Sequence, residues 1–85
     1  MKQSIKDVIA ERNRQIEVEN FNSDHDDKYV YNELLRAAQC YLTGFKAWSW
    51  PWDDAWWKPT SRRENLVKAA ALIIAEIDRL DRKVD

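Results

Sequence analysis

The chain has 85 residues, a net charge of −1, and 45% hydrophobic against 34% charged residues. These proportions indicate one small globular domain over residues 1–85, and they disfavour a disordered chain or direct nucleic-acid binding. The single Cys and single His exclude an internal disulfide and a multi-histidine or cysteine-rich metal site, and one Gly argues against an all-β fold.

The first predicted helix spans about 5–19. Ser4 is its expected N-cap, with Asp7 at the third helical position. Helical spacing places four apolar side chains and Arg12 on one face; the apolar residues are Ile5, Val8, Ile9 and Ile16.

The second predicted helix spans about 29–42 and ends at Gly44, a normal helix stop. Its apolar stripe consists of Tyr31, Leu34, Leu35, Ala38, Tyr41 and Leu42. We expect it to pair antiparallel with the first helix across the 20–28 loop. Cys40 is interpreted as structural.

The third predicted helix spans about 62–82, after a capping box formed by Ser61 and Glu64. Residues 66–75 are apolar almost all round, so the helix is either central or shared with another subunit, and a homo-oligomer is expected. The predicted fold is all-α, with three main helices and a long Trp-rich loop packed on the third.

The loop between the last two helices contains all five Trp residues, from Trp48 to Trp57. In an extended chain Trp48, Trp50 and Trp52 point to one side, where they are candidates for binding a partner protein. Residues 53–57 are expected to make one short helical turn. The alternative is that the indoles fill the core; we expect two or three to be buried and one or two to face a cleft or partner.

A basic segment follows the loop. Lys58, Arg62 and Arg63 surround a helix N-terminus, which favours anions, and Trp56 and Trp57 lie just before it. Together they form a candidate nucleotide site, in which an indole stacks on the base and the cations hold phosphate. The alternative is that Arg62 and Arg63 pair with the 24–27 segment or with Asp53 and Asp54.

The segment Asp24-His25-Asp26-Asp27 combines carboxylates with an imidazole, which can bind a metal or perform acid–base chemistry. The alternative is that its side chains cap the second helix. A ligand-hydrogen-bonding role is favoured over catalysis, and no metal or cofactor is expected. Glu17/Glu19 and Glu76/Asp78 are spaced two apart, so neither pair shares a helix face as in all-helical nucleoside triphosphate pyrophosphatases.

Most of the chain resembles a family of small proteins of tailed phages and prophages. The resemblance rests on residues 10–15 (AERNRQ), His25-Asp26-Asp27, Glu33-Leu34, Trp50-Pro51-Trp52, Trp56-Trp57-Lys58-Pro59 and the helix beginning Arg62-Arg63-Glu64-Asn65-Leu66. It implies action in the cytoplasm of a bacterial host and implies no mechanism.

A fainter similarity links the chain to the repeat domain named after ryanodine receptors. The matching residues are Arg12, Asp26, Asp27, Arg63 and Lys68, and the Trp-rich loop departs from that domain's pattern. This resemblance implies a nucleotide-derived ligand and places Arg12, the Asp pair and Lys68 in one pocket.

The leading hypothesis is therefore a non-catalytic phage or prophage protein that interferes with a host process. It would sequester a nucleotide-derived defence signal or bind a host protein, with Asp24, Asp26, Asp27 and Asp53 mimicking phosphates in the second case. The alternatives are a metal-dependent nucleotide hydrolase using His25, Asp26, Asp27 and Glu33, and a structural or assembly protein. The short apolar runs and the absence of a signal-peptide pattern in residues 1–7 predict a cytoplasmic chain without a membrane span.

Overall fold

The computed structural model describes residues 1–29, 32–46 and 48–83, apart from the side chain of His25. Tyr31, expected in an apolar stripe, lies outside the described residues, as does the His25 side chain. The helices are α1 (Gln3–Glu17), α2 (Ser23–Asp26), α3 (Glu33–Thr43) and α4 (Arg62–Arg82), with a 3-10 turn, η1 (Asp54–Trp56). The predicted all-α fold is confirmed, including the short turn within 53–57.

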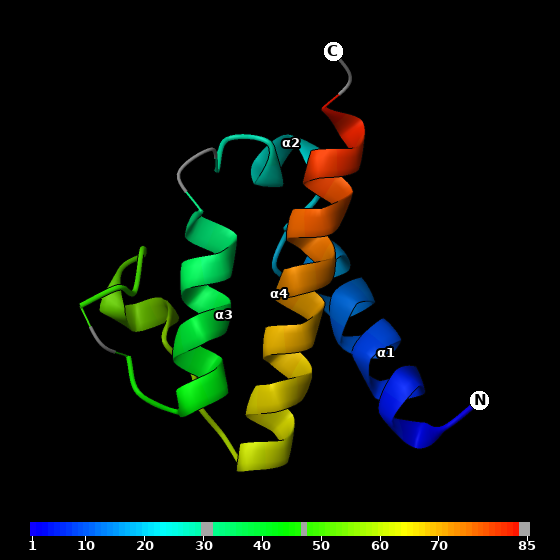
Figure 1. Ribbon diagram of the computed structural model, residues 1–85, viewed down its shortest axis with the longest axis vertical. Coiled ribbons are helices and arrows are strands. Elements are labelled where there is room, and N and C mark those ends of the chain that lie inside the picture. The colour runs from blue at the N-terminus through cyan, green and yellow to red at the C-terminus, as the bar shows by residue number, and fades with distance from the viewer. Residues whose placement is uncertain (30–31, 47, 84–85) are drawn as a thin grey trace.

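The longest helix, α4, lies between α3 and α1 (Figure 1) and contacts both, as well as α2. It runs antiparallel to α3 and in the same general direction as α1 (Figure 1). Helices α1 and α3 run antiparallel to each other, as expected, but they do not pack as a pair because α4 lies between them. The apolar stretch 66–75 explains this arrangement: a helix that is apolar almost all round gains most by taking the central position.

The core joins α3 and α4 to the Trp-rich loop. Leu34, Ala37 and Tyr41 of α3 meet Ala69 and Leu72 of α4, and Trp50 of the loop is buried in the same cluster. The predicted packing of the loop on the last helix is therefore confirmed, and the loop packs on α3 as well. Small side chains at Ala37 and Ala69 let the two helix backbones approach closely.

Some helices begin and end where their capping and turn residues predict, and others do not. Ser61 caps α4 by accepting a hydrogen bond from the Glu64 amide at 3.2 Å, as predicted. Gly44 ends α3 with a left-handed φ of 79°. Ser4, however, lies inside α1, whose N-cap is Lys2. Helix α3 begins at Glu33 rather than near Tyr29, because Asn32 adopts a left-handed φ of 64° that a right-handed helix cannot continue.

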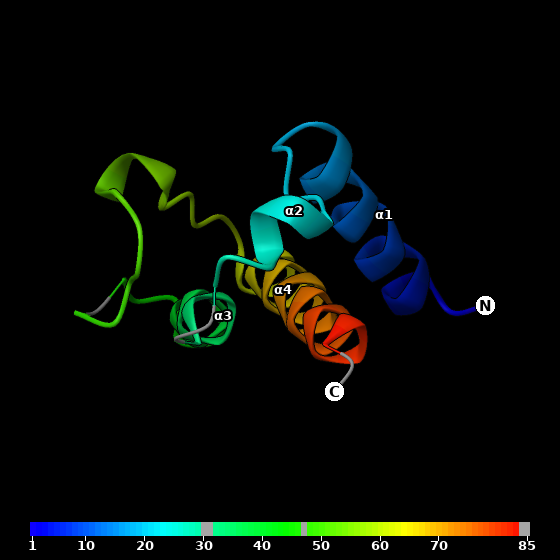
Figure 2. The ribbon, with the colours of Figure 1, turned by 90° about the horizontal axis from the view of Figure 1, so that it is seen from above.

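The molecule is flat, with extents of 38 × 36 × 20 Å. The Trp-rich loop and α2 lie on the same side of α3 and α4 (Figure 2). No segment of the described chain covers the opposite side of these two helices in that view. The two sides of the helical layer therefore differ. The loop and α2 cover one side, and no described segment covers the other, which we call the bare side.

Candidate functional site

The Trp-rich loop is anchored on α3 by an aromatic cluster. Trp50 meets Tyr41 edge-on at 5.9 Å between ring centroids, and Trp57 lies 4.7 Å from the same tyrosine ring. The indole N–H of Trp50 donates to the Asp53 carbonyl oxygen at 3.1 Å. This satisfied donor and the ring contacts fix Trp50 and Trp57 as structural side chains.

A second group of rings extends the cluster toward α2. Trp52 packs on Trp50 at 5.3 Å, on Phe21 at 5.9 Å and on Tyr29 at 5.6 Å. Because Phe21 and Tyr29 flank α2, this contact ties the loop to the segment between α1 and α3. The aromatic contacts thus extend from Tyr41 on α3, through the loop, to the two residues that flank α2.

Polar contacts hold the loop at both of its ends. The Arg36 guanidinium donates to the Ser49 carbonyl oxygen at 3.1 Å, and the Cys40 thiol donates to the Lys46 carbonyl oxygen. At the other end, the ammonium of Lys68 donates to the Lys58 carbonyl oxygen at 2.8 Å. The role of Cys40 is therefore structural, as the sequence indicated.

A cavity of about 830 Å³ lies between this loop, α1 and α4. Its volume is within the range of small-molecule sites, about 300–1,000 Å³. Rings dominate the wall, and they belong to Phe21, Tyr29, Tyr41, Trp50, Trp52 and Trp56. Charged side chains complete it, and they are Glu11, Arg14, Glu19, Asp53, Lys58, Glu64 and Lys68.

The charges on the α1 wall are mutually paired. Arg14 contacts Glu11 at 2.8 Å and Glu19 at 3.2 Å, and these carboxylates raise the pKa of its guanidinium. Lys68 of α4 lies over the Tyr41 ring, 5.6 Å from its centroid, and Lys58 of the loop lies over the Trp56 ring at 5.5 Å. The two ammonium groups therefore face the cavity beside aromatic rings.

Gln15 supplies a buried acceptor in the cavity wall. Its side-chain amide donates to Glu11 at 3.3 Å, and the residue is 3% exposed. Its carbonyl oxygen has no hydrogen-bond partner among the described residues. A buried acceptor without a partner costs about 1–3 kcal/mol, and this oxygen has almost no accessible surface toward the cavity.

The structure brings only part of the predicted ligand site to the cavity. Trp56 and Lys58 line it, whereas Trp57 packs on Tyr41 and Arg62 is absent from its wall. Arg63 instead pairs with Asp7 at 2.8 Å. A hydrogen bond from Gln3 and, after it, this contact with Arg63 lower the pKa of Asp7. The expected pairing of Arg63 with the acidic segments is wrong, because α1 supplies the nearer carboxylate.

Arg12, Asp26 and Asp27 also lie outside the cavity wall. Arg12 and Asp26 form a buried ion pair at 2.9 Å, and Asp27 contacts Arg82 at 2.7 Å. Residues 24–26 thus belong to the short helix α2, and the carboxylates of Asp26 and Asp27 bind α1 and α4. The alternative that this segment caps the following helix is wrong, because α3 has no side-chain cap. The described residues hold no group of three His, Cys, Asp or Glu side chains able to bind a metal.

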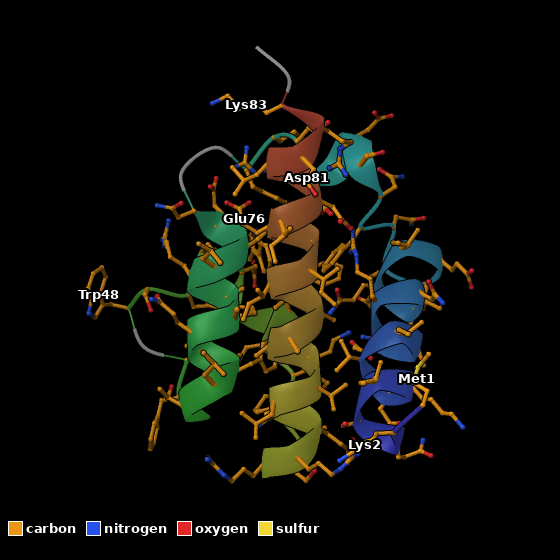
Figure 3. The ribbon with its side chains drawn as sticks, turned by 45° about the vertical axis from the view of Figure 1, so that its right-hand side comes forward. Met1, Lys2, Trp48, Glu76, Asp81 and Lys83 are labelled. Carbon is orange, nitrogen blue, oxygen red and sulfur yellow. The ribbon has the colours of Figure 1, made fainter. Side chains whose placement is uncertain are left out.

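The predicted partner-binding indoles do not share one side. Trp50 is buried and Trp52 is half-buried, while Trp48 is 94% exposed. Figure 3 shows Trp48 projecting away from the helices. Trp56 is also exposed, while Trp57, like Trp52, is half-buried. Trp50 is thus the one fully buried indole, fewer than the two or three expected.

Glu11, Arg14, Gln15 and Glu19 of the wall were not predicted from the sequence. Their spacing follows the helix of α1 and carries no ligand signature, and only the approach of α1 to α4 turns them toward the loop. Lys68 was indicated by resemblance alone.

No protein-family model matches the chain, and no curated protein and no solved structure is significantly similar to it. Within the described part of the chain, every helix is too short or too polar to cross a lipid bilayer. The cavity is therefore the basis for considering function.

Proposed function

We propose that the chain is a non-catalytic binding protein that takes a planar, nucleotide-derived small molecule into the cavity. The observation that carries the proposal is an aromatic-walled cavity of about 830 Å³ with two lysines beside the rings. Stacking of a base on an aromatic side chain contributes about 1–3 kcal/mol. Trp56 is the accessible indole of the wall and is the proposed stacking surface.

The two lysines of the wall suit the phosphate end of such a ligand. Lys58 and Lys68 hold the phosphate, the role that the sequence assigned to Lys58, Arg62 and Arg63. The carboxylates of Glu11 and Glu19 are engaged by Arg14, which supports binding over hydrolysis.

The proposed setting follows from the phage resemblance. The protein would act in the cytoplasm of a bacterial host, and holding the compound would remove a nucleotide-derived signal from a host defence process. Binding without turnover is sufficient for this role, provided that the protein is made in excess of the signal.

Calorimetric titration with a panel of mononucleotides and cyclic dinucleotides tests the proposal. We expect saturable binding to at least one compound, and a loss of about 5- to 100-fold in affinity for Trp56→Ala. Lys68→Gln should weaken binding of phosphorylated compounds and leave nucleosides little affected. Trp48→Ala is the matched control, because it removes an indole outside the cavity wall. Silence across the panel at high micromolar ligand, or equal loss in Trp48→Ala, rejects the proposal.

The exposure of Trp48 and Phe45 favours a second candidate, binding of a host protein through residues 45–48. Large exposed aromatic side chains are common anchors at interfaces. Asp26 is buried and Asp27 is paired with Arg82, so Asp24 and Asp53 are the more accessible phosphate mimics. A partner captured from host lysate that is lost with Trp48→Ala and kept with Trp56→Ala supports this candidate over the first.

A further inference from the structure

Helix α4 has a second apolar face in addition to the one that packs in the core. Leu66, Ala70, Ile73, Ile77 and Leu80 repeat at alternating spacings of four and three, the pattern of a helix that packs along another helix. Leu66, Ile77 and Leu80 are exposed, whereas Ala70 and Ile73 are half-buried and Ile73 also packs against the edge of the core. This face is therefore uncovered at both of its ends. We name these five residues the α4 seam.

Helix α1 extends the same side of the molecule. Its polar residues Glu11 and Gln15 face the cavity, on the side that carries the loop. Ile5 and Ile9 project from the other side of α1 and are about half exposed. On α4 the seam residues lie round the helix from Leu72, which packs in the core with Trp50 of the loop. Figure 2 shows that no described segment covers the side of α3 and α4 away from the loop. Helix geometry therefore assigns the seam and the two isoleucines of α1 to one apolar surface on that side.

We propose that a second copy of this chain covers this surface, with the two α4 helices antiparallel about a two-fold axis. In the register that faces Leu66 with Ile77 of the other copy, Ala70 meets Ile73. Each small side chain then lies opposite a large one, which allows close packing. Four of the five seam residues are therefore complementary to one another when the helix is reversed, as a two-fold interface requires, and Leu80 lies at the end of the seam opposite position 63 of the other copy.

The charges at the ends of α4 agree with this register. Arg63 and Asp81 are about five full turns apart, so they lie on the same edge of the seam. Both are exposed, and Figure 3 shows Asp81 near the C-terminal end of α4. Antiparallel pairing brings Arg63 of each copy close to Asp81 of the other copy. This contact is in addition to the one that Arg63 makes with Asp7 of its own copy. The net charge of −1 adds little repulsion between copies.

Sedimentation equilibrium of the full chain over micromolar to millimolar concentration tests the proposal. We expect a reversible dimer for the wild type, and a dimer dissociation constant at least about 100-fold higher for Ile77→Lys, since a lysine in the seam leaves a buried charge without a partner. Val18→Lys is the matched control, because Val18 is exposed outside the seam. Circular dichroism shows that each variant remains helical.

The register is tested by charge exchange. Asp81→Arg should weaken the dimer several-fold by facing Arg63, and Asp81→Arg combined with Arg63→Asp should restore part of the affinity. A monomeric wild type at millimolar concentration, or a dimer unaffected by Ile77→Lys, overturns the proposal. Failure of the double variant to exceed the single one overturns the antiparallel register.

Discussion

Adjacent carboxylates on α2 contact different helices. Asp26 is fully buried and pairs with Arg12, which also donates to the Phe21 carbonyl oxygen at 3.3 Å. Asp27 faces the other way and pairs with Arg82 at the exposed end of α4. Two neighbouring residues with the same chemistry therefore differ in their contribution to stability, because only one pair is shielded from water.

We expect Asp26→Asn to lower the free energy of unfolding by about 3–5 kcal/mol, since it leaves the Arg12 guanidinium buried without a counter-charge. Arg82→Gln, which breaks the exposed pair, should cost less than about 1 kcal/mol. Urea unfolding followed by circular dichroism measures both values. Equal losses of unfolding free energy in the two variants would show that the Arg12–Asp26 pair is not shielded from water.

Tyr41 predicts a pH dependence of stability. Burial raises the pKa of its hydroxyl above the ordinary value of 10.0, so the folded state favours the neutral form. The unfolded chain ionises first, and stability present below pH 10 is lost as the pH rises toward the folded pKa. In urea unfolding at pH 8 and pH 10.5, Tyr41→Phe should lose less stability between the two pH values than the wild type. An identical loss in both would rule out a contribution from Tyr41.

At the scale of elements, the helix ends show where local sequence decides structure. Ser61 and Glu64 satisfy donors at the start of α4 without help from elsewhere in the fold. Ser4 offers the same chemistry, but α1 begins at Gln3, two residues earlier than it would if Ser4 were the N-cap. A cap residue is thus effective only where the chain enters the helix, and the entry to α1 at Lys2 precedes Ser4.

We expect Ser61→Ala to destabilise the protein by about 1 kcal/mol, because the Glu64 amide loses its acceptor. Ser4→Ala should be neutral or slightly stabilising, since Ser4 lies within α1 and Ala is the better helix former. Thermal unfolding of the two variants beside the wild type makes the comparison. A larger cost at Ser4 would place the functional cap of α1 there instead.

At the scale of the whole molecule, α4 is the element on which the others pack. Helices α1, α2 and α3 each contact it, and the loop reaches it through Trp50 and Lys68. Helix α1 packs only along one side and leaves Ile5 and Ile9 exposed. Its local opening should therefore cost less free energy than opening of α4.

Hydrogen exchange of backbone amides tests this order. At a concentration that keeps the chain monomeric, protection should be highest in α4, then α3, and lower in α1, with the 48–60 loop amides exchanging fastest outside the termini. Ile77→Lys provides a monomeric reference. Protection of α1 equal to that of α4 would mean that the two helices open together.

Several features followed from the sequence because they depend on neighbours along the chain. The all-α class, the bounds of α4 at 62–82, its Ser61 cap and the stop at Gly44 all rest on periodicity and turn chemistry. The late start of α3 did not follow, because the left-handed conformation of Asn32 depends on how the chain enters from α2.

The candidate site was predictable only in part, for the same reason. The density of indoles located the loop, and Trp56 and Lys58, two of the residues proposed to bind a ligand, line the cavity. The paired Arg14 wall and the buried Gln15 could not be identified, because neighbours on α1 do not reveal which face of the helix meets the loop. The sequence assigned Arg63 to an anion site, whereas in the structure Arg63 forms an ion pair with Asp7, which is distant in sequence.

Local sequence alone therefore determined the three long helical segments and which segment carries the indoles, since hydrogen bonding within a helix and capping act over a few residues. It did not predict the short helix α2 within the 20–28 segment. The tertiary structure decided which faces are covered. Helix α4 takes the central position, α1 turns Glu11 and Gln15 inward and its isoleucines outward, and Trp50 and Trp48 separate into core and solvent. These outcomes depend on contacts between residues far apart in the chain, because different segments compete to cover the same apolar surface.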